Sequence, residues 1–216
     1  MKLLLTGRPG CGKTTVVLRF LAAMGRGAGG FYTEEWRSGG ARAGFALITT
    51  GVSIVSMGST SCTGSTNVST GCATGEPAGG AMTGARGVLA WERHQPPPAA
   101  ASPHRAALGR YVVDVGAVER LAVPAVLAAL ADARVTCVVI DEIARMELMS
   151  AEFRRAVTAA FDGPKAVLAT IRLAPDPFCD ALKRRAGVKV IEVTGANRDR
   201  LPSELAASLG GRQTGG

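Results

Sequence analysis

The chain has 216 residues, which is enough for one α/β domain with a buried core. Its five cysteines show neither C-x-x-C nor Cys/His ligand spacing, so the sequence excludes a zinc site and a disulfide framework and favours a reducing, cytoplasmic location. The formal net charge of +8 suits an anionic partner, but the few aromatic residues do not cluster with arginines, so nucleic acid is permitted and not favoured. The apolar run at 3–5 is too short for a signal peptide or a membrane span, and no membrane partner is expected.

Hydrophobic periodicity predicts strands that alternate with helices along the chain. Strands are predicted at 3–6, 31–36, 44–49, 87–91, 111–115, 135–140, 166–171 and 188–193. Helices are predicted at 15–24, 116–133, 150–161, 180–186 and 197–209, and Pro124 predicts a kink or a late start in the second of these. This alternation predicts an α/β fold with a mostly parallel sheet and helices on both faces. In such sheets, ligands bind at the carboxyl ends of the strands.

Residues 51–86 differ in composition from the rest of the chain. They are mainly Gly, Ser, Thr and Ala, with almost no charge and no sustained periodicity. A segment of this kind buries too little apolar surface to offset its ordering entropy. We therefore expect one domain over residues 1–216, with a flexible low-complexity insertion at about 51–105 that includes a stiff proline run at 96–98.

A glycine-rich loop with the pattern G-x-x-x-x-G-K-T lies between the first strand and the first helix. Its glycines let the backbone turn tightly and bring N–H groups against phosphate oxygens, and the helix dipole favours the same anions. Lys13 is expected to bridge the β- and γ-phosphates, and the Thr14 hydroxyl is expected to ligate Mg²⁺. The predicted nucleotide-binding residues of this loop are Gly7, Arg8, Pro9, Gly10, Cys11, Gly12, Lys13, Thr14 and Thr15.

Two acids follow the apolar strand at 135–140. A carboxylate in this position can hold Mg²⁺ through its water shell, and we assign that role to Asp141. Glu142 is the candidate general base or water-orienting group, because side chains diverge at a strand end and one acid can face the attacking water. The alternative is that Asp141 and Glu142 only form a polar strand end.

Two further residues have both a functional and a structural interpretation. Arg145 lies just beyond the acidic strand, where it could neutralise charge on the γ-phosphate and act in catalysis, or form a surface salt bridge with Glu147 or Glu152. Asn197 follows the last strand, where it could contact the base or ribose, or cap the last helix. The N-K-x-D pattern of guanine-specific sites is absent from this stretch.

The chain resembles the small nucleoside-triphosphatases that include the human cancer-related enzyme and its thermophile relatives. The resemblance rests on the blocks at 7–15, 30–35, 111–114, 141–148 and 193–199, in this order and spacing. It implies hydrolysis of ATP, GTP and other nucleoside triphosphates to the diphosphate and phosphate, with Mg²⁺ and low base specificity. It also implies a P-loop NTPase fold with a RecA-like sheet, in which an extra strand lies between the loop strand and the acidic strand.

The sequence departs from this family at three places. Ala144 and Arg145 replace the usual Gly-Lys pair, and Arg172 stands where the family often has proline. The segment at 51–86 has no counterpart in the resemblance. A change from lysine to arginine keeps the charge but not the point-like geometry of an ammonium group.

Two alternative functions remain open from the sequence. A kinase for a nucleoside or another small acceptor would use the same loop, with residues 172–185 as an arginine-rich lid, although Glu142 argues against it. A nucleotide-dependent RNA-binding switch would use the positive charge. We expect nucleoside triphosphates as the partners of a monomeric protein.

Overall fold

The structure is a computed structural model that describes residues 1–38, 40–51 and 83–210. Its strands are β1 (Lys2–Thr6), β2 (Ala28–Ser38), β3 (Ala41–Thr50), β4 (Thr83–Glu92), β5 (Arg105–Leu108), β6 (Tyr111–Asp114), β7 (Cys137–Ile143), β8 (Ala166–Ile171) and β9 (Val188–Glu192). Its α-helices are α1 (Lys13–Met24), α2 (Val115–Ala117), α3 (Val123–Ala131), α4 (Ala151–Asp162), α5 (Pro177–Lys183) and α6 (Leu201–Gly210). Shorter turns are η1 (Gly25–Gly27), the π-helix η2 (Val118–Ala122) and η3 (Glu147–Met149).

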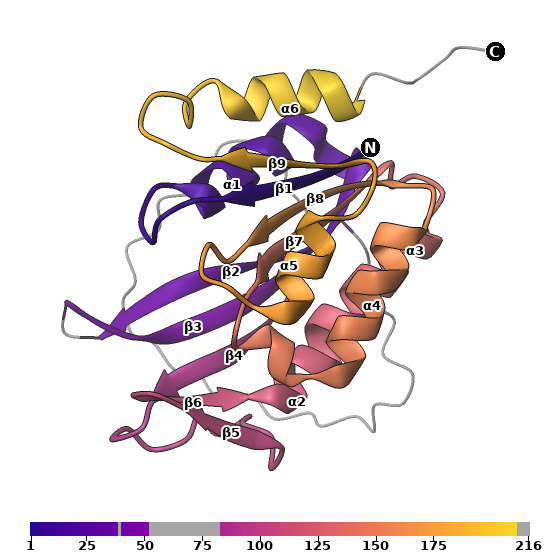
Figure 1. Ribbon diagram of the computed structural model, residues 1–216. Helices are drawn as coiled ribbons and strands as arrows, with labels where there is room; N and C mark the ends of the chain where they lie inside the picture. Colours follow the sequence, from indigo (N-terminus) through magenta and orange to yellow (C-terminus); the bar gives the residue numbers. More distant parts are fainter. Residues whose placement is uncertain (39, 52–82, 211–216) are drawn as a thin grey trace.

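The described strands form one sheet in the order β5-β6-β4-β3-β2-β7-β8-β1-β9. From β2 to β9 every neighbouring pair is parallel, and the strands from β5 to β2 are antiparallel to one another. Strand β8 lies between the loop strand β1 and the acidic strand β7, as the resemblance implies. The predicted α/β fold is confirmed, and the hairpin of β2 and β3 joins its parallel part to the antiparallel extension (Figure 1).

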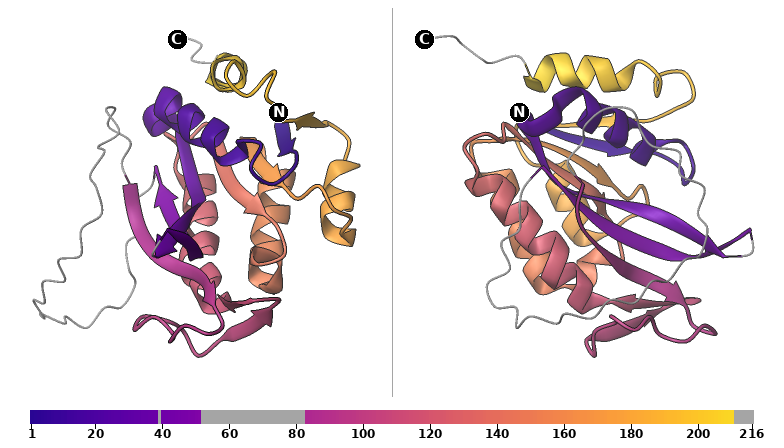
Figure 2. Two further views of the ribbon diagram at one scale, coloured as in Figure 1. Left: turned by 90° about the vertical axis from the view of Figure 1, so that its left-hand side faces the viewer. Right: turned by 180° about the vertical axis from the view of Figure 1, so that it is seen from behind.

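Helices cover both faces of the parallel part (Figures 1 and 2). Strand β1 shows why, because its alternate side chains enter different cores: Leu3 and Leu5 pack with α1 and α6, whereas Leu4 packs on the side of α3 and α4. Helix α1 contributes residues four apart to its core, including Val17 and Leu21. Within the described residues, no helix combines the length and apolar character needed to cross a membrane.

The expected insertion at 51–105 extends too far at its C-terminal side. Strand β4 begins at Thr83 and pairs with both β3 and β6, and Leu89, Ala90 and Trp91 are buried in the sheet. The sequence predicted only part of this strand, at 87–91. The expectation for 52–82 falls outside the described residues.

Several predicted helices begin elsewhere than expected, including α6, which begins at Leu201 and not at 197. The stretch at 116–133 is divided into α2, the π-helix η2 and α3, whose first turn contains Pro124. Proline lacks the N–H that a continuous helix needs, and a π-type turn just before it accommodates the loss. Helix α5 begins at Pro177 and not at 180, because the Asp176 carboxylate caps it by accepting from the N–H groups of Phe178 and Cys179 at 3.0 and 3.1 Å.

Asp114 links the antiparallel extension to the helical layer. It is 1% exposed and is the last residue of β6, where its Oδ1 accepts from Ala117 N at 2.8 Å and caps α2. Its Oδ2 accepts from Ser102 N at 2.8 Å, and Arg120 lies 3.7 Å away. One buried carboxylate therefore fixes three segments of the chain.

Candidate active site

The glycine-rich loop joins the carboxyl end of β1 to the start of α1. Gly7, Gly10 and Gly12 have φ values of 146°, 79° and 104°, which side chains rarely adopt. A Cβ on Gly7 would lie 2.8 Å from Val193 O and from Cys11 Sγ, so this position is also closed sterically. A Cβ on Gly10 would meet open space, which leaves the mouth of the loop free for a ligand.

The other loop residues divide into an exposed tip and a packed base. Arg8, Pro9 and Gly10 are exposed, and Cys11 N donates to Arg8 O at 3.2 Å to close the turn. The Cys11 side chain packs against the core formed with α1 and α6, so it fills space at the base of the loop. Thr15 is exposed on the first turn of α1.

Lys13 meets the acidic strand. Its Nζ lies 3.6 Å from Glu142 Oε1 and 3.4 Å from Gly7 O, and its side chain is only 13% exposed. The peptide bond between Asp141 and Glu142 is cis. Because β1 and β7 run parallel on either side of β8, their carboxyl ends bring the loop lysine and the glutamate to one place.

Asp141 is the buried acid beneath the loop. It is 1% exposed, and its Oδ1 accepts from the Thr170 hydroxyl at 2.5 Å. The pKa of Asp141 is raised to about 6, mainly by burial and also by the negative charge of Glu142, although the hydroxyls of Thr170 and Thr14 offset part of the rise. Its Oδ2 is buried without a hydrogen-bond partner among the described residues.

The residues near Asp141 fit a magnesium ion. In nucleotide sites Mg²⁺ keeps several waters and takes one or two protein oxygens together with phosphate oxygens. Asp141 Oδ2 is an unused oxygen, and the Thr14 hydroxyl lies close enough to influence the Asp141 carboxyl. Within the described ranges, no cluster of three or more His, Cys, Asp or Glu forms a closed metal cage. A closed cage is not needed in a site of this type.

Glu147 is a second buried acid that the sequence did not single out as functional. It opens the turn η3 after β7 and is 3% exposed, and its Oε2 has no hydrogen-bond partner in the described part of the chain. Burial raises the pKa of Glu147 to about 8, and the charges of Glu142 and Asp141 raise it in the same direction. The sequence signal that could have identified Glu147 is an acid between two apolar residues, Met146 and Leu148, in the turn after β7.

A pocket of about 550 Å³ opens beside Lys13 and Glu142. Its walls are mainly apolar side chains from β3, β4, β5 and the segments after β7 and β8. Glu147, Arg145 and Arg172 also line it. Arg145 is exposed and forms neither of the two salt bridges considered for it, since Glu152 pairs with Arg155 and Glu147 Oε2 has no partner among the described residues.

A smaller pocket of about 230 Å³ lies on the other side of the loop, between α1 and the segment after β9. Gly12, Thr15 and Arg198 line it. Asn197 is close by but is engaged with the backbone: its Oδ1 accepts from Thr194 N and its Nδ2 donates to Glu192 O, both at 2.8 Å. It cannot cap α6, which begins at Leu201, so the capping interpretation is wrong, and its contact with a nucleotide stays a prediction.

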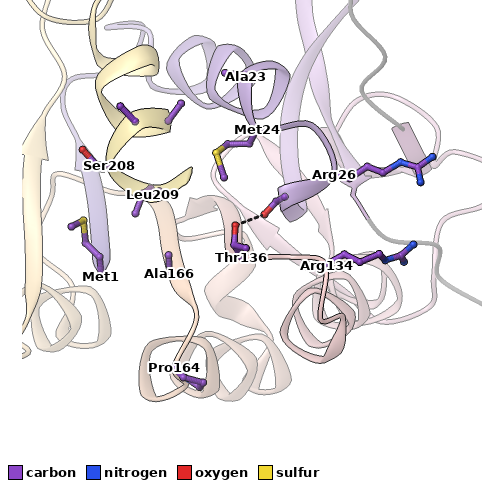
Figure 3. Close-up of a pocket in the computed structure, with 13 residues that line it drawn as sticks. Met1, Ala23, Met24, Arg26, Arg134, Thr136, Pro164, Ala166, Ser208 and Leu209 are labelled. Atoms are coloured by element: carbon purple, nitrogen blue, oxygen red, sulfur yellow. Dashed lines mark hydrogen bonds between the residues drawn. The ribbon is translucent and has the colours of Figure 1, made fainter. Parts of the chain in front are cut away.

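The pocket in Figure 3, about 1000 Å³, lies at the opposite edge of the sheet, near the amino ends of β1, β7 and β8. Thr136 uses its hydroxyl to bond Gly27 O at 3.1 Å, and Arg134 pairs with Asp132 at 2.6 Å. The rest of the lining includes alanines, methionines and Leu209. No carboxylate of the described residues lines this pocket, so we place the chemistry at the glycine-rich loop.

Fold and site together define a P-loop NTPase: a glycine-rich loop before a helix, a buried acid at the end of a neighbouring parallel strand, and a glutamate beside the loop lysine. The chain matches a family model described as NTPase over residues 2–70 and 79–206. It belongs to this nucleoside-triphosphatase family and is an enzyme that hydrolyses nucleoside triphosphates. The match includes 51–70 and 79–86, so the expectation that 51–86 has no counterpart is wrong for most of that segment.

Named relatives span nearly the whole chain. Nucleoside-triphosphatase THEP1 of Thermotoga petrophila is 36% identical over 95% of this chain and 90% of its own length. The cancer-related nucleoside-triphosphatase of Homo sapiens is 32% identical over 95% of this chain and 94% of its own. Among solved structures, THEP1 from the hyperthermophile Aquifex aeolicus superposes with a TM-score of 0.68 at 29% identity, covering 97% of this chain and 99% of that one.

Proposed function

We propose that this enzyme is a Mg²⁺-dependent nucleoside-triphosphatase that releases phosphate from ATP, GTP and other nucleoside triphosphates with low base specificity. The observation that carries the proposal is the contact of 3.6 Å between Lys13 and Glu142 above the buried Asp141. It brings a phosphate-binding cation and a candidate base to one point. The protein is proposed to act as a single domain and a monomer.

Each residue at the loop has a part in this proposal. Backbone N–H groups of residues 7–15 bind the phosphates, and Lys13 neutralises charge on the γ-phosphate. Thr14 and Asp141 would hold Mg²⁺, which when bound neutralises the β- and γ-phosphate oxygens. Glu142 orients the attacking water and accepts its proton, and it is 31% exposed on its side chain, so water reaches it. Arg145, exposed at the pocket, stabilises charge that develops on the γ-phosphate.

We propose low base specificity from the pocket beside α1, where the nucleoside would bind. The pocket there is small, at about 230 Å³. Its charged side chains are Arg198, Arg19 and Asp199, of which Arg19 and Asp199 pair with each other at 3.1 Å. Asn197, which the sequence suggested for base contact, uses its amide on the backbone. A base would therefore be held by stacking and shape more than by hydrogen bonds that discriminate among bases.

The test is phosphate release from ATP, GTP, CTP and UTP with and without Mg²⁺, for the wild type and Glu142→Gln. We expect release from all four, a requirement for Mg²⁺, and a loss of at least about a hundredfold in the variant with nucleotide binding retained. Glu152→Gln is the matched control, since Glu152 is 54% exposed and pairs only at the surface. Undiminished turnover in Glu142→Gln would remove Glu142 from its role.

The role of Arg145 is tested with its own pair of variants. Arg145→Ala is expected to lower phosphate release about tenfold to a thousandfold while nucleotide binding changes little. Arg155→Ala is the control, because Arg155 is 74% exposed on α4 and away from the pocket. Equal turnover in the two variants would show that Arg145 lies at the pocket rim without a part in catalysis.

A further inference from the structure

The pocket beside the phosphate loop has more apolar surface than the hydrolysis of a phosphoanhydride requires. Water and a γ-phosphate need polar surroundings, yet this pocket of about 550 Å³ is walled by Phe45, Leu89, Leu108, Met146 and Leu173. Volumes of this size, with mainly apolar walls and a few convergent polar groups, are typical of sites for small organic molecules. The pocket also includes Lys13 and Glu142, so an occupant lies next to the reacting phosphate.

Glu147 supplies a second, independent observation. Glu147 lines the pocket and is 3% exposed, and its buried Oε2 has no hydrogen-bond partner among the described residues. A buried polar atom without a partner costs about 1–3 kcal/mol, so such atoms usually mark a missing ligand or water. A turn of the Glu147 side chain toward the pocket would let the polar end of an organic molecule satisfy this oxygen.

We propose that the pocket binds a small molecule with an apolar body and two hydroxyl groups, of which one is held by Glu147 and the other accepts the γ-phosphoryl group. The proposal rests on the assignment of Lys13 and Glu142 to the phosphate-transfer site. It adds phosphoryl transfer to an alcohol to the hydrolysis proposed above. Water and the alcohol compete for the same phosphorus.

The transfer step balances without a further reactant. The bond between the γ-phosphorus and the oxygen that bridges it to the β-phosphate breaks, and its electrons stay on the nucleoside diphosphate. A new bond forms between the γ-phosphorus and the hydroxyl oxygen of the acceptor. The hydroxyl proton passes to the Glu142 carboxylate and then to solvent, so the products are a phosphate monoester, the diphosphate and one proton.

The experiment measures where the phosphoryl group goes. The full chain is incubated with ATP and Mg²⁺ plus 1,4-benzenedimethanol, and phosphorus NMR separates the phosphate monoester from free phosphate. We expect monoester with this dialcohol and at least about fivefold less with 4-methylbenzyl alcohol, which lacks the second hydroxyl. Phosphate release with no monoester from either alcohol would overturn the inference while leaving the proposed hydrolysis intact.

Matched leucine variants test the location of the site. Leu173 lines the pocket and is 50% exposed, whereas Leu127 is 48% exposed on α3 and lies outside the pocket. We expect Leu173→Ala to lower the ratio of monoester to free phosphate about tenfold, and Leu127→Ala to leave it unchanged. An unchanged ratio in Leu173→Ala would contradict the location. Monoester formation without any phosphate release in the absence of alcohol would support the acceptor site and contradict the proposed hydrolysis.

Glu147→Leu tests the anchoring contact by a separate readout. We expect the variant to lose the preference for 1,4-benzenedimethanol over 4-methylbenzyl alcohol, because leucine has no polar atom to hold the second hydroxyl. A preference equal to that of the wild type would remove Glu147 from the site.

Discussion

Replacing Glu147 by glutamine should change how the stability of the protein depends on pH. Burial holds the pKa of Glu147 at about 8, against 4.5 for an ordinary glutamate. The folded state therefore keeps a proton on this carboxyl that the unfolded chain releases, and stability falls as pH rises from 4.5 to 8. Each pH unit corresponds to about 1.4 kcal/mol, so the wild type should lose up to about 5 kcal/mol through this one group. Glutamine does not ionise, so the variant does not lose stability in this way as pH rises.

The measurement is urea unfolding of wild type and Glu147→Gln at pH 5, 6, 7, 8 and 9, without nucleotide. The buried amide shifts the stability of the variant by an amount that is the same at every pH. The difference between the two proteins should move in favour of the variant as pH rises and level off above pH 8. Asp141 titrates in both proteins, and because its charge is one of the causes of the raised pKa of Glu147, the difference includes the coupling between these two acids. Two parallel curves across this range would refute the reasoning.

Three further substitutions test the packing, each by urea unfolding. Asp114→Ala should cost about 3–5 kcal/mol, because two buried N–H groups lose a charged acceptor at 2.8 Å; a loss below 1 kcal/mol would mean that the carboxylate does not hold its three segments. Gly30→Ala should cost about 2–4 kcal/mol, since its φ is 140° and a Cβ would lie 2.0 Å from Val139 O; unchanged stability would contradict this backbone path. Lys2→Met should cost about 2 kcal/mol, because Lys2 Nζ donates to three backbone carbonyls at 2.6–2.9 Å near the end of α4; a neutral result would show that water replaces it.

The parallel part of the fold was predictable because its signals are local. Buried strands such as β7 are continuously apolar, and the loop pattern fixes the junction of β1 and α1 by itself. The errors fall where the signal is short or composite. Strand β5 has four residues with alternating burial, too few for periodicity to show. The start of α5 was within reach of the sequence, since Asp176 followed by Pro177 is a helix N-terminal signature.

The residues of the candidate site also divide into those that local signals predict and those that depend on the folded sheet. Lys13 and Asp141 were placed because strand ends in a parallel sheet meet at one edge, which is a rule about topology and needs no side-chain detail. Glu147 was not placed, because the pocket that it lines is completed by Phe45, Leu89 and Leu108, which come from β3, β4 and β5. Those strands belong to the antiparallel extension, and only the folded sheet brings them over the end of β7. The residues proposed for hydrolysis lie at strand ends whose meeting the sequence predicts, whereas the apolar pocket depends on how β3, β4 and β5 pair in the folded sheet.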